Sequence, residues 1–245
     1  MTRLWLRWTW HHLRLLARDR DVMFWNVGFF VLLLVLFLGV LSGGDQAVRI
    51  SLTISLVTIG IMATALFSVG VGMAGAHERG VFARFALVPL GRGVIVAAVL
   101  SARVVLVLAT AALQLCVAAV VFRVPWSGGM ASWIAVITAG ALAFSAIGFL
   151  ISTAAASSAG ANTYANLVFI PMMALSGTAV PLSLMPPAWA SRSWILPSAT
   201  IASALNDALV AGASVADNAR ALAYLAGWAA VAAALGVYRW TRRHD

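Results

Sequence analysis

The sequence has no lysine, one cysteine and few charged residues, and each shortage excludes a class of protein. All sixteen basic residues are arginine, so the chain lacks the phosphate-binding lysine of a conventional ATPase and any Schiff-base lysine. The single cysteine, Cys116, excludes an internal disulfide and a zinc site built from cysteines. Hydrophobic residues make up 63% and charged residues 9%, with a mean hydropathy of +0.99. This composition excludes an ordinary water-soluble protein and predicts an all-α integral membrane protein.

Six apolar segments are each long enough to cross a bilayer as a helix, which takes about 20 residues. They cover residues 22–42, 51–74, 93–122, 130–153, 161–182 and 219–239. An even number of spans places both ends of the chain on one side. Eleven arginines fall on that side, four fall on the other, and Arg103 lies within the third span. Because cytoplasmic segments carry the excess of arginine, we expect both termini in the cytoplasm.

Residues 1–20 are predicted to form an amphipathic helix in the membrane interface. At 100° per residue, four arginines share a sector of about 60°; these are Arg3, Arg7, Arg14 and Arg18. Guanidinium groups facing headgroups and indoles facing acyl chains make membrane lipids an expected partner. An alternative is that these arginines only determine the orientation of the chain across the membrane. The net charge is +9. The arginines that produce it are distributed as the membrane topology requires and do not form a binding patch, so we expect no nucleic-acid partner.

Residues 76–92 mix charged and apolar side chains in a way that favours a short helix contacting another protein. The charged residues are Glu78, Arg79, Arg84 and Arg92, and the apolar ones are Val81, Phe82, Phe85 and Leu87. Gly80 and Pro89 would bound the turn. The apolar side chains can enter a groove of the partner while the charges pair at its rim. In the alternative, this is an ordinary charged loop that joins two spans.

The Glu-Arg-Gly-x-x-x-Arg core of this stretch and its Pro-Leu-x-Arg ending resemble the first coupling element of the ABC-2 type transporter permeases. Residues 166–187, with an interrupting proline, a Leu-Ser-Gly step and a proline-rich exit, resemble the fifth helix of those permeases. The resemblance covers residues 1–245 as a single transmembrane domain. It is closest to the daunorubicin-resistance type of drug-efflux membrane subunit. Uniform arginine is a departure, since relatives often mix in lysine.

The resemblance implies a transport subunit, not an enzyme, that exports an amphiphilic drug or natural product across the bacterial inner (plasma) membrane. Such multidrug efflux would need a second permease copy or a paralogue. It would also need two separate ATP-binding cassette subunits, which bind ATP and Mg and hydrolyse ATP, while this chain binds no cofactor. The coupling residues would be Glu78, Arg79, Gly80, Phe82, Arg84, Phe85, Pro89 and Arg92.

Polar residues inside the spans are candidates for the substrate pathway. Arg103 lies about 15 Å along the third span, and a charge at that depth serves either the pathway or a structural contact. No span contains a carboxylate, so backbone carbonyls, Gln114, a lipid phosphate or a second chain remain as its partners. The resemblance places the pathway along spans 1, 2 and 5. The expected lining residues are Asn26, Thr58, Arg103, Asn162, Asn166 and Ser176.

Residues 183–218 are expected to form short helices on the outer side, one of them capped by Ser198 and ending near residue 210. The resemblance implies that two such helices are re-entrant and close the outer end of the pathway. In the alternative, this segment lies on the outer surface. Within the fourth span, a stripe of small residues predicts close helix packing; it consists of Ala141, Ser145, Gly148 and Ser152.

Three other functions are weaker. Lipid or polysaccharide export by the same architecture is the nearest, and the three tyrosines of the chain make an aromatic-lined polymer channel the less favoured reading. A gradient-driven secondary transporter would normally show intramembrane carboxylates or paired broken helices. An intramembrane enzyme needs a base beside a buried nucleophile, yet all four histidines lie in predicted cytoplasmic segments. The same inventory predicts no metal site.

Overall fold

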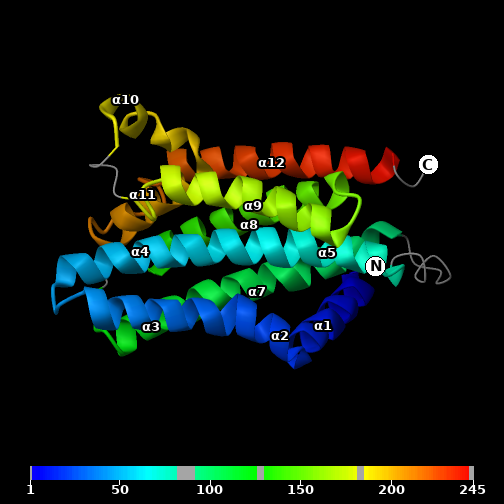
Figure 1. Cartoon of the computed structure of the whole chain (residues 1–245), viewed down its shortest axis with the longest axis horizontal. Coiled ribbons are helices and arrows are strands. Elements are labelled where there is room, and N and C mark those ends of the chain that lie inside the picture. The colour runs from blue at the N-terminus through cyan, green and yellow to red at the C-terminus, as the bar shows by residue number, and fades with distance from the viewer. Residues whose placement is uncertain (1, 82–91, 126–129, 181–184, 243–245) are drawn as a thin grey trace.

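The computed structural model describes residues 2–81, 92–125, 130–180 and 185–242, and these residues form helices joined by short connections. Figure 1 shows the long helices side by side in one elongated bundle. Helix α1 (Thr2–Arg18) begins at the end of the bundle where α12 (Ala219–Arg242) ends. The described chain confirms the all-α fold and brings both of its ends to one side.

Within the described residues, five helices are long and apolar enough to cross a membrane: Arg20–Leu41, Gln46–Glu78, Gly93–Val120, Met130–Ala154 and Ala219–Arg242. The first combines α2 (Arg20–Met23), η1 (Phe24–Gly28) and α3 (Phe29–Leu41). The second combines α4 (Gln46–Ala63), η2 (Thr64–Val71) and α5 (Gly72–Glu78). The third and fourth are α7 (Arg92–Val120) and α8 (Met130–Ala154).

The fifth predicted span, 161–182, ends earlier than expected. Its helix α9 runs from Ser158 to Leu175 and contains Pro171, which bends or weakens a helix without ending this one. The helix stops because Ser176 is its C-cap and Gly177 takes a φ of 84°, a conformation open to glycine. Residues 176–180 are bends rather than helix, so the count of six spans stays a prediction.

Helix α8 lies at the centre of the bundle and packs against η2, α11 and α12. The small-residue stripe along it is confirmed, because Ala141, Ser145, Gly148 and Ser152 are all buried. A Cβ at Gly148 would lie 2.7 Å from the Ala65 carbonyl oxygen. The two backbones therefore touch at this crossing, in the way that small residues permit between membrane helices.

Two π-helical segments interrupt the first two spans, and the sequence analysis did not predict them. They are η1 and η2, which lie next to each other in space: the Asn26 carbonyl oxygen of η1 accepts a hydrogen bond from Thr64 Oγ1 of η2 at 3.2 Å. Thr110 Oγ1 of α7 donates to the same oxygen at 3.2 Å. A wider turn releases carbonyl groups from the regular helical pattern, and such turns are common at functional sites.

The segment between α9 and α12 contains α10 (Pro187–Ala190), the short helix η4 (Ser193–Ile195) and α11 (Pro197–Leu209). The expected role of Ser198 as a cap is wrong, because Leu196 is the N-cap and Pro197 occupies the first turn. Helix α11 is largely buried against α8 and α4, so it is part of the bundle rather than a loop on its surface. Its depth in a bilayer stays a prediction.

Candidate substrate cavity and coupling site

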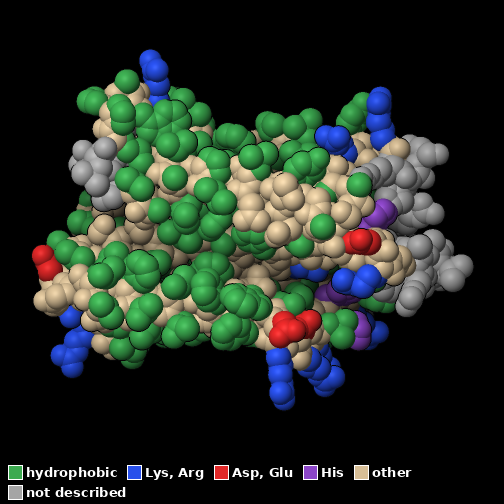
Figure 2. Space-filling model, viewed as in Figure 1, with side chains coloured by type: hydrophobic (Ala, Val, Ile, Leu, Met, Phe, Trp, Pro, Cys, Tyr) green, Lys and Arg blue, Asp and Glu red, His purple; other side chains and the backbone are tan. Residues whose placement is uncertain are grey.

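A cavity of about 970 Å³ lies between the N-terminal helices, the second and third long helices of the bundle, and α9. One wall comes from α1, α2, η1 and α3, and the other comes from α4, η2, α5, α7 and α9. Figure 2 shows that His side chains lie at the end of the bundle near the chain termini, while hydrophobic side chains cover much of its middle. The charged, histidine and asparagine side chains that line the cavity are His12, Asp19, Asn26, Arg79, Arg103 and Asn162.

Arg103 projects from α7 into this cavity, roughly 16 Å along the helix from its first residue. Its Nη1 donates to the backbone carbonyl oxygen of Ser68 and to the Ser68 hydroxyl, the latter at 3.2 Å. Gly72 leaves room for the guanidinium, which occupies the place that a side chain at position 72 would fill. Of the partners expected for Arg103, the structure therefore selects a backbone carbonyl.

Gln114 was one of the other expected partners of Arg103, and the structure places it elsewhere. Its Nε2 donates to the carbonyl oxygens of Phe30 at 3.3 Å and Leu56 at 3.2 Å. These bonds connect α7 to α3 and α4 in the buried core. Gln114 is therefore a structural link between the first three spans, and the hydrogen bonds described for its side chain and for Arg103 do not join the two.

Three of the six residues expected to line the pathway lie in this cavity: Asn26, Arg103 and Asn162. The other three do not line it. Thr58 is buried and donates to the Ile54 carbonyl oxygen of its own helix at 2.8 Å. Asn166 is one turn from Asn162 and donates to its carbonyl oxygen at 2.9 Å. Ser176 is buried and lies 2.9 Å from the Thr178 hydroxyl. Hydroxyl groups of membrane helices often bond to their own backbone in this way.

Glu78 connects the end of the second span to the start of α9. Its Oε2 accepts hydrogen bonds from the backbone N–H of Ser158 at 3.0 Å and from the Ser158 hydroxyl at 2.6 Å. A carboxylate is favoured there because the first N–H groups of a helix lack partners and carry the positive end of its dipole. The contact joins residues that are 80 positions apart in the chain.

Of the remaining predicted coupling residues, the structure describes Arg79 and Gly80 and the backbone of Arg92. Arg79 is the C-cap of α5 and lines the cavity, and Gly80 has a φ of 66°, which ends the helix. The predicted coupling residues Phe82, Arg84, Phe85 and Pro89 lie outside the described residues. Arg92 is the first residue of α7, and its side chain is also outside the description.

A comparison with protein families decides the classification. A family model for ABC-2 type transporters matches residues 3–210, which is most of the chain. The chain belongs to the ABC-2 type transporter family. Members of this membrane family are permease domains rather than ATPases, which indicates a membrane permease component of an ABC transporter. No curated protein matches the chain.

Two residues of this ABC-2 permease that the sequence analysis did not select also line the cavity. His12 of α1 lies there, and its ring nitrogen Nδ1 is 3.1 Å from the Trp8 carbonyl oxygen. Burial lowers the pKa of His12 below its usual value. Asp19 lines the cavity and caps α2 by accepting from the backbone N–H groups of Asp21 and Val22. Neither position has a signal in the sequence, because α1 must first fold back against α7.

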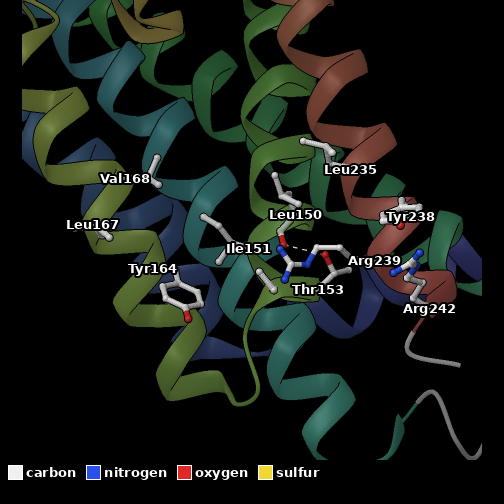
Figure 3. Close-up of a pocket in the computed structure, with 11 residues that line it drawn as sticks. Leu150, Ile151, Thr153, Tyr164, Leu167, Val168, Leu235, Tyr238, Arg239 and Arg242 are labelled. Carbon is white, nitrogen blue, oxygen red and sulfur yellow. Dashed lines mark hydrogen bonds between the residues drawn. The ribbon is translucent and has the colours of Figure 1, made fainter.

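The ABC-2 permease has a second groove of about 700 Å³ between α8, α9 and α12, which Figure 3 shows in close-up. Its wall is mainly apolar, with Leu150, Leu167 and Leu235 among the lining residues. Two arginines of α12 also line it: Arg239, whose side chain points towards α8, and Arg242, which lies beside Tyr238. The Arg242 guanidinium is 4.7 Å from the centre of the Tyr238 ring, a cation–π contact. This groove is separate from the Arg103 cavity. A substitution of one of its arginines can therefore serve as a control for a substitution of Arg103.

Proposed function

We propose that this chain is the membrane-spanning subunit of an ATP-driven exporter that moves an amphiphilic drug or natural product out of the cytoplasm. The observation that carries the proposal is the family match over residues 3–210. The chain itself lacks the lysine of a conventional nucleotide-binding loop, so a separate ATP-binding subunit binds ATP and Mg. Two permease subunits, identical or paralogous, complete the exporter. The daunorubicin-resistance type is the subtype that its sequence motifs favour.

The Glu78 contact supports a route by which movement of the ATPase changes the shape of the cavity. The segment after Glu78 contacts the ATP-binding subunit, and Glu78 holds the first residue of α9 through two hydrogen bonds. Helix α9 in turn places Asn162, Phe169 and Met173 on the cavity wall. A displacement of the loop therefore moves α9 relative to the cavity, as a rigid helix transmits motion along its length.

The distribution of charge supports an orientation with both termini in the cytoplasm. Both ends of the described chain lie at one end of the bundle (Figure 1). Basic residues are concentrated in α1, which begins at that end, and in the last turn of α12, which ends there; among them are Arg14, Arg18, Arg239 and Arg242. Segments rich in arginine remain on the cytoplasmic side during insertion. The proposed location is the bacterial inner membrane, which the chain crosses several times.

Transport into inside-out membrane vesicles tests this proposal. Vesicles from native cells that overproduce the chain would be given a panel of fluorescent amphiphiles, and vesicles from cells without the chain would be the control. We expect uptake of at least one amphiphile that needs ATP and continues when a protonophore collapses the proton gradient. Uptake that stops with the protonophore and ignores ATP would instead establish the gradient-driven secondary transporter.

A further inference from the structure

The charged groups of the Arg103 cavity make its interior positive. The ionisable side chains that line it are His12, Asp19, Arg79 and Arg103. Two of these are permanent cations and one is a carboxylate. Burial lowers the pKa of His12, so its imidazole is neutral at pH 7. The described lining therefore carries one excess positive charge. Asp19 and Arg79 are exposed, whereas the Nε of Arg103 is buried, so the charge of Arg103 acts most strongly.

Arg103 has hydrogen-bonding capacity that the protein leaves unused. A guanidinium has five N–H donors, and both hydrogen bonds described for Arg103 come from Nη1. Its Nε is buried and has no hydrogen-bond partner within the part of the chain that the structure describes. Among the same residues, no ion pair joins Arg103 to Asp19 or to another carboxylate. A buried, unpaired cation is costly, so such a group normally has an anionic partner.

Apart from Asn26, Ser68 and Asn162, the other lining residues are apolar or aromatic. Trp25, Phe29 and Phe30 lie on one wall, while Phe169 and Met173 lie on the other. A volume of about 970 Å³ is large enough for a drug-sized molecule. The cavity thus combines a cationic centre with an apolar surface, which is the complement of an anionic amphiphile.

We infer that the cavity binds amphiphiles with an anionic head group, a carboxylate, sulfate or phosphate, which Arg103 and Arg79 hold while the tail lies against the aromatic side chains. This inference rests on the proposed function, because it names the class of exported substrate. A cationic head group is disfavoured in this cavity, because it would meet two arginines. The anion can come from the membrane, as a lipid, or from the cytoplasm, as a free amphiphile.

Binding to the purified full-length chain tests the inference without any ATPase or transport step. The chain would be placed in phosphatidylcholine nanodiscs and titrated with dansyl-undecanoic acid, an anionic probe, and with a dansyl alkylamine of equal chain length. We expect the anionic probe to bind at least about tenfold more tightly than the amine, as a hydrogen-bonded charge pair in such a site requires. Equal binding of the two probes, or tighter binding of the amine, would overturn the inference.

Three variants assign the binding to Arg103. Arg103→Gln should weaken binding of the anionic probe about tenfold or more. Gly72→Ala keeps the charge but fills the place of the guanidinium, so it should also weaken binding and covers the case in which Arg103→Gln does not fold. Arg239→Gln removes the same charge from the separate groove and should bind the probe like wild type. Unchanged binding in folded Arg103→Gln and Gly72→Ala would also overturn the inference.

A last arm distinguishes the two sources of the anion. In nanodiscs with added phosphatidylglycerol, a site that takes membrane lipid should lose affinity for the probe through competition, and this loss should be absent in Arg103→Gln. If affinity is unchanged, the site takes the free amphiphile. Both results support an anion site. A failure of anion binding would leave the permease proposal intact, because the vesicle experiment reads ATP-dependent transport independently.

Discussion

Replacing Gly148 by valine will leave little folded protein, because this glycine lies where α8 touches the backbone of η2. A Cβ there would be 2.7 Å from the Ala65 carbonyl oxygen and 3.2 Å from the Gly70 nitrogen. Both atoms belong to the backbone, so they cannot move aside as the end of a flexible side chain can. We expect a loss of about 3 kcal/mol or more, the upper part of the range for overpacked cores.

Size-exclusion chromatography and thermal unfolding in detergent check this expectation. The matched control is Gly227→Val on α12, since Gly227 is exposed and has no atom within 4 Å of an added Cβ. The control should elute as a single peak and unfold near the wild-type temperature. Similar behaviour of the two variants would show that the α8–η2 crossing is looser than the structure has it.

Glu78→Lys will abolish transport while leaving the chain inserted in the membrane. The lysine cannot accept the two hydrogen bonds from Ser158, and its ammonium group would face the positive end of the α9 dipole. The link between the coupling segment and the cavity wall is then lost. We expect ATP-dependent uptake to fall more than about tenfold, as for the loss of charge-assisted hydrogen bonds, and Glu78→Gln to retain part of it.

Asp217, which lies just before α12, offers a matched control for this change. Asp217 Oδ2 accepts from the Ser214 backbone N–H and from the Ser214 hydroxyl, each at 2.8 Å, which is the same arrangement that Glu78 makes with Ser158. These bonds lower the pKa of Asp217. Asp217→Lys should therefore impose the same local loss and keep transport. If both variants transport normally, Glu78 has no role in coupling.

The positions of the five long apolar helices could be predicted because the bilayer sets a minimum length and an apolar composition. The same holds for the stripe on α8, whose small residues recur at helical spacing and are buried as expected, Gly148 at the closest crossing. The early end of α9 was missed, since hydrophobic residues continue past Gly177 and only the backbone conformation there reveals the stop. The two π-helical segments were missed for a similar reason, because η1 and η2 have ordinary apolar sequences.

The candidate site was predicted only in part, because its residues come from distant segments. Arg103 and the asparagines were found since polar groups within apolar runs are conspicuous in a sequence. His12 and Asp19 were not, because their place beside the cavity depends on how α1 packs against α7. The role of Glu78 as a partner of Ser158 likewise depends on the tertiary fold, since no local pattern pairs residues 80 positions apart.

The most direct test of the central claim is affinity purification of the chain from native membranes in a mild detergent. Mass spectrometry would identify the co-eluting proteins, and an ATP hydrolysis assay would be run on the same fractions. The account predicts a stoichiometric subunit with nucleotide-binding motifs and measurable ATP hydrolysis. A chain that purifies alone and without ATP hydrolysis, under conditions that preserve known membrane complexes, would contradict it.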